Sequence, residues 1–140
     1  MTIEKAKAIV NVVDEGIIIG SDTVTVKLQQ KMAYTSIELL SNRRHRIYTG
    51  ICIIKNDKAE YRDLNRVIKS ILKFKKLSKT EINYYCTLKE GIGNVGGRSI
   101  QGYSESYTSF LSGSFSNIVG LPLFKTINML NSVGFYVHHK

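Results

Sequence analysis

The segment Gly16-Ile-Ile-Ile-Gly-Ser-Asp-Thr-Val-Thr-Val26 decides how the fold is interpreted, because it is rich in β-branched residues. Ile17-Ile18-Ile19 and the alternating Thr23-Val24-Thr25-Val26 are typical of a buried strand. Between them, Gly20-Ser21-Asp22 has the composition of a small turn. We therefore predict a strand that is broken at this turn, and we expect Asp22 to lie at a strand end or kink.

Helical patterns flank this strand on both sides. Before it, apolar residues recur at helical spacing over residues 3–13, and Gly16 ends that helix. After it, Ala33, Ile37 and Leu40 show the same spacing. Residues 46–55 then alternate in polarity and are rich in Ile, Tyr and Thr, which predicts a second strand.

The next segments contain one ambiguous element and one clear helix start. Residues 67–74 have apolar spacing that suits a helix and a β-branched content that suits a strand, so periodicity leaves both open. Ser78-Lys-Thr-Glu81 has the form of a capping box, in which a hydroxyl and a carboxylate satisfy two helix-terminal amides. We predict a helix from there to about Leu88.

A last helix is predicted near Pro122, a residue that favours the first turn of a helix. Phe124, Ile127, Leu130 and Val133 recur on one helical face. The alternation of helices and strands predicts a single α/β domain over residues 1–140.

The composition excludes several classes of protein. The chain has 140 residues, of which 43% are hydrophobic, and one proline, so it can build a core and is too apolar for a disordered chain. Cys52 and Cys86 lack CxxC spacing, which argues against a disulfide scaffold, a zinc site or a redox motif. No apolar run approaches the roughly 20 residues of a membrane helix, and the start lacks a secretory signal. We expect a cytoplasmic protein without a membrane span.

The chain is strongly basic, with a formal net charge of +9. A basic stretch is formed by Arg62, Arg66, Lys69, Lys73, Lys75, Lys76 and Lys79. If residues 67–74 form a strand, Lys69, Lys73 and Lys75 project on one face of it. Such a stretch is more often a solvated face than a nucleic-acid site, and no RNA- or DNA-binding motif accompanies it. The sequence alone therefore favours a solvated face.

The segment at residues 91–102 contains five glycines. Glycine permits positive φ angles and close approach of the backbone to a ligand. This segment is therefore a candidate ligand-binding loop.

Several short segments, in this order along the chain, carry a resemblance to a known family. They are Glu4-Lys5-Ala6, Gly20-Ser21-Asp22-Thr23-Val24, Leu40-Ser41-Asn42-Arg43-Arg44-His45, Tyr48-Thr49-Gly50, Leu77-Ser78 with Glu81-Ile82, Ile100-Gln101-Gly102, and Gly113-Ser-Phe-Ser-Asn-Ile-Val-Gly-Leu-Pro122. Together they resemble the Maf family of nucleoside triphosphate pyrophosphatases, which are related by fold to inosine triphosphatases. The last block is the most specific.

The resemblance implies an α/β fold with a mixed sheet and flanking helices. It also implies a cleft in which a nucleoside triphosphate is hydrolysed between its α and β phosphates, giving the monophosphate and pyrophosphate. By resemblance, Asp22 is the general base for the attacking water. A divalent cation, Mg or Mn, is expected as cofactor, with Asp22 and the substrate phosphates as candidate ligands. A carboxylate there can deprotonate a water whose pKa the metal has lowered.

Three further residues match substrate-binding positions of the family. Lys5 matches a lysine that faces the phosphates, where an ammonium group offsets developing charge. Thr23 and Gln101 match two positions that help to choose the nucleotide, and the pair resembles the branch that prefers dTTP and UTP. An amide such as that of Gln101 offers both a donor and an acceptor to a pyrimidine edge.

Two other motifs have both a functional and a structural interpretation. Arg43-Arg44-His45-Arg46 resembles the family's Ser-Gly-Arg-x-His segment, and four cations in a row either attract a triphosphate or form a solvated loop. Ser116 and Asn117 belong to the most recognisable block, but their side chains are also suited to capping the last helix. We do not include them among the candidate site residues.

The chain departs from the family's pattern in three places. The family's first strand and its Ser-x-Ser-Pro-Arg-Arg phosphate loop are expected to be missing before Glu4, so the domain is incomplete at its N-terminus. The segment from Lys27 to Lys31 is too short for the family's Gly-Lys-Pro motif, and Asn94 stands where the family has a lysine. Phosphate-binding cations are therefore missing, and each one contributes to transition-state stabilisation.

These departures leave two hypotheses. The chain is either a nucleoside triphosphate pyrophosphatase, or an inactive, truncated member of the family that at most binds nucleotide or a partner. A homodimer is compatible with both, and the sequence neither supports nor excludes it.

Overall fold

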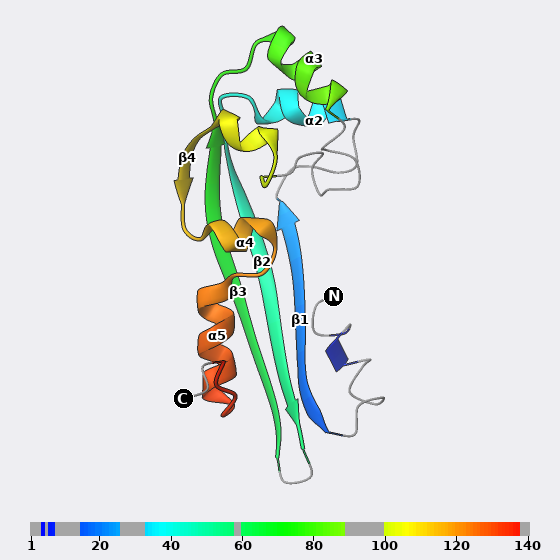
Figure 1. Cartoon of the computed structure of the whole chain (residues 1–140), viewed down its shortest axis with the longest axis vertical. Coiled ribbons are helices and arrows are strands. Elements are labelled where there is room, and N and C mark those ends of the chain that lie inside the picture. The colour runs from blue at the N-terminus through cyan, green and yellow to red at the C-terminus, as the bar shows by residue number, and fades with distance from the viewer. Residues whose placement is uncertain are drawn as a thin grey trace.

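The fold is that of a computed structural model, in which residues 4, 6, 7, 15–25, 33–57, 60–88 and 100–137 are described (Figure 1). Its elements in chain order are β1 (Gly16–Thr25), α2 (Ala33–Leu40), β2 (Arg44–Asn56), β3 (Tyr61–Phe74), α3 (Lys79–Thr87), the 3-10 helix η1 (Tyr103–Tyr107), β4 (Thr108–Ser112), α4 (Phe115–Val119) and α5 (Leu123–Ser132). Glu4, Ala6 and Lys7 are helical, and the rest of the helix predicted over residues 3–13 lies outside the described residues.

The strands form one four-stranded sheet in the order β1-β2-β3-β4, and every described strand pair is antiparallel. The long strands β2 and β3 form a hairpin that runs the length of the molecule (Figure 1). Helices flank this sheet, which confirms the α/β fold class. The predicted helix at residues 33–40 and the predicted strand at residues 46–55 are also confirmed.

The predicted break in the first strand is wrong. β1 runs without interruption from Gly16 to Thr25, and each of its residues has a partner in β2, from Gly16 opposite Asn56 to Thr25 opposite Ile47. Asp22 therefore lies inside a strand and not at a strand end or kink. The long ladder with β2 outweighs the local turn preference of the sequence around Gly20, since every second residue pair along it adds two backbone hydrogen bonds.

The ambiguous residues 67–74 belong to strand β3. This segment pairs with β2 on one side, as in Val67 opposite Gly50, and its upper part pairs with β4 on the other, as in Ile71 opposite Ser112. A strand with two neighbours satisfies its backbone on both edges. Tertiary pairing thus decides between two local preferences of similar strength.

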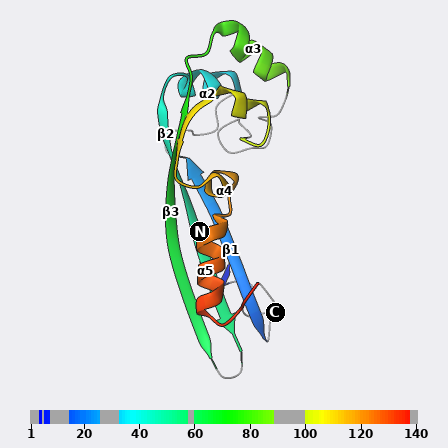
Figure 2. The same ribbon diagram turned by 60° about the vertical axis from the view of Figure 1, so that its left-hand side comes forward.

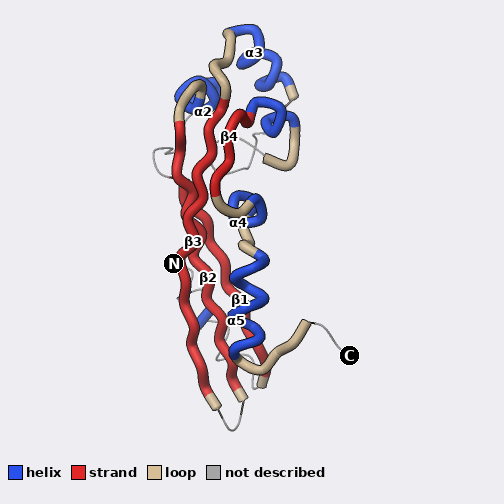
Figure 3. The backbone as a smooth tube through the Cα atoms, turned by 90° about the vertical axis from the view of Figure 1, so that its left-hand side faces the viewer, coloured by secondary structure: helices blue, strands red, loops and turns tan. Residues whose placement is uncertain are grey.

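The sheet has two different faces. Because side chains alternate along a strand, Thr49, Ile51 and Ile53 lie on one face, which we call the packed face. Asp22 and Cys52 lie on the other, which we call the Asp22 face. Helices α4 and α5 lie across the packed face (Figures 2 and 3). The cluster that α5 buries there consists of Ile51, Ile53, Met129, Leu130 and Val133.

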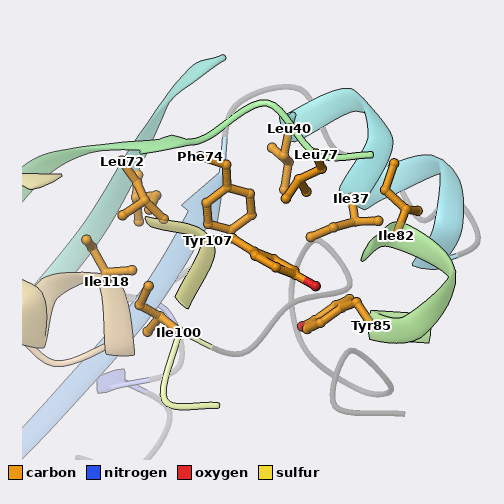
Figure 4. Close-up of a cluster of buried hydrophobic side chains, with 11 residues drawn as sticks. Ile37, Leu40, Leu72, Phe74, Leu77, Ile82, Tyr85, Ile100, Tyr107 and Ile118 are labelled. Atoms are coloured by element: carbon orange, nitrogen blue, oxygen red, sulfur yellow. The ribbon is translucent and has the colours of Figure 1, made fainter. Parts of the chain in front are cut away.

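The largest hydrophobic cluster lies at the end of the molecule that carries α2 and α3 (Figure 4). Aromatic rings form its centre, with the ring of Tyr107 6.5 Å from that of Phe74 and 6.1 Å from that of Tyr85, both edge-to-face. Edge-to-face contacts between rings stabilise a core in addition to the hydrophobic effect of burying the rings. The buried members are Ile37, Leu40, Ile47, Leu72, Phe74, Leu77, Ile82, Tyr85, Ile100, Tyr107 and Ile118.

Helix α5 buries a different face from the predicted one. Leu130 and Val133 are buried as expected, but Phe124 is 71% exposed, and Thr126 and Met129 are buried instead. The Thr126 hydroxyl donates to the carbonyl of Pro122 at 2.9 Å, which allows a polar residue to face the core. The first turn of α5 therefore points Phe124 away from the sheet.

The capping box before α3 is confirmed. The Ser78 hydroxyl accepts from the Glu81 amide at 3.2 Å, and the Glu81 carboxylate accepts from the Ser78 amide at 2.9 Å. The Lys75 ammonium also donates to this carboxylate. Hydrogen bonds from Lys75, and then from the Ser78 backbone, lower the pKa of Glu81 to about 2. The helix ends at Thr87 with Leu88 as its C-cap, close to the predicted end.

A small cluster covers the lower part of the Asp22 face. Ala6 packs there with Ile18, Cys52 and Ile54, so the N-terminal helical residues lie on this side of the sheet. Cys52 and Cys86 are both free, and burial, followed by the nearby Asp63 carboxylate, raises the pKa of the Cys52 thiol.

An ion pair also fixes the N-terminal helical residues. The Lys7 ammonium lies 3.3 Å from the Asp63 carboxylate on β3. None of the helices in the described ranges has the length and apolar character required to cross a membrane.

Candidate active site

The segment Ser21-Asp22-Thr23 lies near the upper end of β1, where three of the resemblance segments meet. The Thr23 hydroxyl lies 2.9 Å from the Thr49 hydroxyl on β2, and the Thr49 hydroxyl donates to the carbonyl of Asn117 in α4 at 3.0 Å. The Ser21 hydroxyl donates to the carbonyl of Gly120 at 2.6 Å. Segments that are far apart in the sequence therefore form one hydrogen-bonded unit on the packed face.

The turn after α4, which contacts β1, depends on the backbone conformation of Gly120. Its φ angle is +130°, a conformation that side-chain-bearing residues rarely adopt. A Cβ atom added there would lie 3.6 Å from the Thr23 hydroxyl oxygen. Gly120 thus lets the chain turn toward Leu121 while it holds the strand that carries Asp22.

Asp22 points to the opposite face from Ser21 and Thr23, because neighbouring residues of a strand alternate. Its partner in β2 is Gly50, which presents no side chain, and the next residue across the sheet, Val67, is 73% exposed. The carboxylate is half-buried. Among the described residues, the cross-strand neighbours of Asp22 are therefore a glycine and an exposed valine, and neither places a bulky or charged side chain against the carboxylate.

The structure does not bring all predicted site residues together. Asp22 and Thr23 are adjacent in the chain but face opposite sides of the sheet, and the Thr23 hydroxyl is engaged with Thr49. Gln101 is exposed and lies in the turn before η1, beside the buried Ile100. Lys5 lies outside the described residues, and the described Ala6 and Lys7 lie on the Asp22 face.

The glycine-rich segment and the shortened segment after β1 fall largely outside the described residues. Of residues 91–102, the structure describes only residues 100–102. The described ranges also leave out residues 26–32 and Asn94. The predictions that rest on them therefore stay predictions.

The interpretation of residues 43–46 as four cations in a row is wrong. His45 is 6% exposed and its ring lies edge-to-face against Phe74, with centroids 5.3 Å apart. The strand alternation turns His45 into the core and leaves Arg44 and Arg46 exposed on the Asp22 face. Arg44 places its guanidinium 5.1 Å from the centre of the Phe110 ring.

Residues 113–122 connect α4 and the turn after it to the strands around Asp22. The Ser114 hydroxyl caps α4 by accepting from the Asn117 amide at 3.3 Å, and the Ser116 hydroxyl accepts from the Leu123 amide at 3.1 Å. The Asn117 side-chain amide donates to the Ser70 hydroxyl at 2.8 Å and to the carbonyl of Ile68 at 3.3 Å. The expected helix-capping role of Ser116 is thus confirmed, while Asn117 ties α4 to β3.

Sequence reasoning missed two residues that shape the surroundings of Asp22. Thr49 and Gly50 lie in a segment that the resemblance contains, but no role followed for either of them from the sequence. Their roles come from the register, which places Thr49 opposite Thr23 and Gly50 opposite Asp22. Predicting the pairing register of β1 and β2 from the sequence would have placed Thr49 and Gly50 beside Thr23 and Asp22.

The fold and the site define the class of this protein. It is an α/β domain in which the β2–β3 hairpin pairs with β1, the strand that carries the Asp22 carboxylate. The chain matches the family described as Maf-like protein over residues 1–133, and it belongs to that family. The resemblance seen in the sequence is therefore confirmed.

Several relatives of this chain come from Rickettsia species. The chain is 45% identical to the protein named nucleoside triphosphate pyrophosphatase of Rickettsia felis, in a match that covers 98% of this chain and 72% of the relative. It is 46% identical to the protein of the same name from Rickettsia canadensis, with 96% and 71% covered. For the Rickettsia rickettsii protein of that name, strain Sheila Smith, the identity is 48%, with 94% and 66% covered.

Proposed function

We propose that this chain is a nucleoside triphosphate pyrophosphatase, which converts a nucleoside triphosphate and water into the monophosphate and pyrophosphate. Membership of the Maf-like family and the names of the relatives support the class of reaction. The single observation that carries the proposal is the placement of Asp22, half-buried in the edge strand β1 and opposite Gly50 of the neighbouring strand β2. A carboxylate there has support from the sheet and room for reactants.

In the proposed reaction, Asp22 acts as general base. Its carboxylate takes a proton from the attacking water, whose oxygen forms a bond to the α-phosphorus. The bond from the α-phosphorus to the oxygen that bridges to the β-phosphate breaks, and pyrophosphate leaves with that electron pair. The absence of a side chain at Gly50 gives the triphosphate access to the carboxylate.

We propose Mg or Mn as the cofactor. Within the described ranges, no three His, Cys, Asp or Glu side chains gather into a metal-binding group. The residues present fit a cation held by Asp22 together with substrate phosphates, because Mg commonly uses one or two carboxylates and phosphate oxygens. When bound, such a cation neutralises phosphate charge and lowers the pKa of water.

We further propose dTTP and UTP as preferred substrates, and the cytoplasm as the location. The preference rests on the family resemblance at Thr23 and Gln101. The exposed Gln101 amide is free to present its donor and acceptor to a base, whereas we assign Thr23 to holding β1 through Thr49. Lys5 is the proposed contact to the phosphates.

The proposal is tested by pyrophosphate release from UTP, dTTP and other triphosphates by the purified chain, with Mg or Mn. We expect Asp22→Asn to lower turnover about 10²- to 10⁴-fold, the usual contribution of a general base, while nucleotide binding is retained. Asp57→Asn is the matched control, since Asp57 follows β2 at the far end of the hairpin. This control is expected to keep full turnover.

Two outcomes contradict the proposal in different ways. Equal turnover in wild type and Asp22→Asn removes the assignment of the base but keeps the activity. A folded wild-type chain that releases no pyrophosphate from any triphosphate contradicts the activity itself and supports an inactive family member that binds nucleotide or a partner.

A further inference from the structure

The upper part of the Asp22 face carries a basic surface that the proposed reaction does not use. Three rows of side chains cross the strands there in register. The rows are Val24, Tyr48 and Lys69, then Arg46, Ile71 and Ser112, and then Arg44, Lys73 and Phe110. We call the surface formed by Arg44, Arg46, Lys69, Lys73, Tyr48 and Phe110 the basic face.

The cations of the basic face have no carboxylate partners among the described residues. Lys7, Lys55, Arg62 and Lys75 each form an ion pair with an acidic side chain. In contrast, no such pair is formed by any of the four cations of the basic face in the described part of the chain. Their positive charge is therefore available to an external anion.

The arrangement of these charges is unfavourable in the isolated molecule. Arg44 lies directly opposite Lys73 on the neighbouring strand, and Arg46 follows Arg44 on the same face, about 7 Å further along the strand. Like charges that lie directly opposite in a sheet are destabilising. Departures from a local stability rule commonly occur at functional sites.

Exposed apolar and aromatic surface lies beside the charges on the same face. Val24 is 59% exposed, Val67 is 73% exposed and Phe110 is 42% exposed. The Arg44 guanidinium already stacks on the Phe110 ring, 5.1 Å from its centre. Tyr48 lies next to Lys69 in the register and is half-buried. The surface thus offers both cations for phosphates and rings on which bases can stack.

We infer that the basic face binds single-stranded nucleic acid. Cations along two neighbouring strands match a line of phosphates, and the aromatic rings among them match unpaired bases, which have open π-faces. A duplex hides its bases in the stack, and its grooves admit a helix or a two-stranded ribbon more readily than the broad face of a sheet. The net charge of +9 attracts a polyanion over a longer range.

The test is the binding of a fluorescent single-stranded oligonucleotide of mixed sequence to the full chain at several salt concentrations. If the four cations each neutralise one phosphate, wild-type affinity falls about 50-fold between 50 and 200 mM salt. In the variant with Arg44, Arg46, Lys69 and Lys73 all changed to Gln, we expect the salt slope to decrease by about 3 and affinity at 50 mM salt to fall at least about 10-fold.

A second variant tests the aromatic part of the basic face. We expect Phe110→Ala to lower the affinity about 10-fold and to leave the salt slope unchanged, since stacking carries no charge. The matched control changes Arg62, Arg66, Lys79 and Lys125 to Gln, which removes the same charge from other parts of the surface. This control is expected to keep most of the affinity.

Three results overturn the inference. The first is equal loss of affinity in the control and in the basic-face variant, which would indicate attraction by net charge alone. The second is equal binding of a duplex of the same length. The third is binding to phosphatidylserine vesicles with no binding to the oligonucleotide. Thermal unfolding of each variant shows whether it is folded, and Phe110→Ala tests the inference independently if the fourfold variant is not.

Discussion

The two faces of the sheet differ in what their polar residues do. On the packed face, the Thr23 and Thr49 hydroxyls and the side-chain nitrogen of Asn117 form hydrogen bonds that connect β1 and β2 to α4 and β3. On the Asp22 face, Asp22 and Lys69 stand beside exposed surface. Neighbouring residues of one strand therefore have separate tasks, and a family motif such as Ser21-Asp22-Thr23 combines chemistry with scaffolding.

The most recognisable block of the sequence belongs to the scaffold. Ser114, Ser116 and Asn117 cap helices and bind β3, and none of these contacts leaves the packed side of the sheet. The strength of a sequence motif thus does not identify it as the reactive part of a protein. Three pairs of variants, one between the two faces, one on the packed side and one involving the helix above the sheet, test how these regions contribute to stability.

The largest difference is expected between Phe74→Ala and Val67→Ala, both in β3. Phe74 is fully buried in the largest cluster, whereas Val67 is 73% exposed on the Asp22 face. We expect Phe74→Ala to lower the free energy of unfolding by about 3–5 kcal/mol, because it leaves a cavity. Val67→Ala is expected to change it by less than about 0.5 kcal/mol. Urea unfolding measures both, and similar values would remove the distinction between the faces.

A smaller difference is expected between two glycines on the packed side. Gly113 and Gly134 both have positive φ angles, of +104° and +82°. A Cβ atom at Gly113 would lie 2.7 Å from the Ser70 hydroxyl oxygen, which bonds Ser114 and Asn117, while Gly134 has open space. We expect Gly113→Ala to cost about 3 kcal/mol, through backbone strain and overpacking together.

Gly134→Ala is the control for backbone strain alone, and we expect it to cost about 1 kcal/mol. Thermal or urea unfolding of the two variants gives the comparison. Equal costs would mean that the contact between Gly113 and Ser70 contributes nothing to how α4 is held against the sheet.

The smallest effect concerns the helix that covers the upper core. The pKa of Glu81 is lowered from its ordinary value of 4.5 to about 2, so its ionised form stabilises the fold. This contribution is fully present above about pH 4.5 and is lost as the pH falls through about 2. We expect Glu81→Gln to be less stable than wild type at pH 6, and the difference to shrink as the pH falls toward 2.

Unfolding experiments at pH 6, 4, 3 and 2 follow this difference. A difference that stays constant over the whole range would contradict the assigned ionic role of Glu81 toward Lys75. Glu60→Gln, which removes another surface carboxylate with basic partners, is the control for general charge effects.

Much of the fold followed from local signals. The capping box at Ser78 and Glu81 predicted the start of α3, because both hydrogen bonds join residues three positions apart. The alternation in residues 46–55 predicted β2, because a half-buried strand repeats every two residues. The orientation of Phe124 and the burial of His45 were not predicted, because these depend on which neighbouring element covers them.

The sequence by itself determined the family, the approximate positions of α2, β2, α3 and α5, and Asp22 as the candidate base, because residue type and spacing along the chain carry this information. Only the tertiary structure decided that Asp22 lies within a continuous strand, that Thr23 faces the other way, and that Arg44 stands opposite Lys73. The physical reason is that strand register and sheet packing join residues far apart in the chain, and local preferences are too weak to specify these pairings.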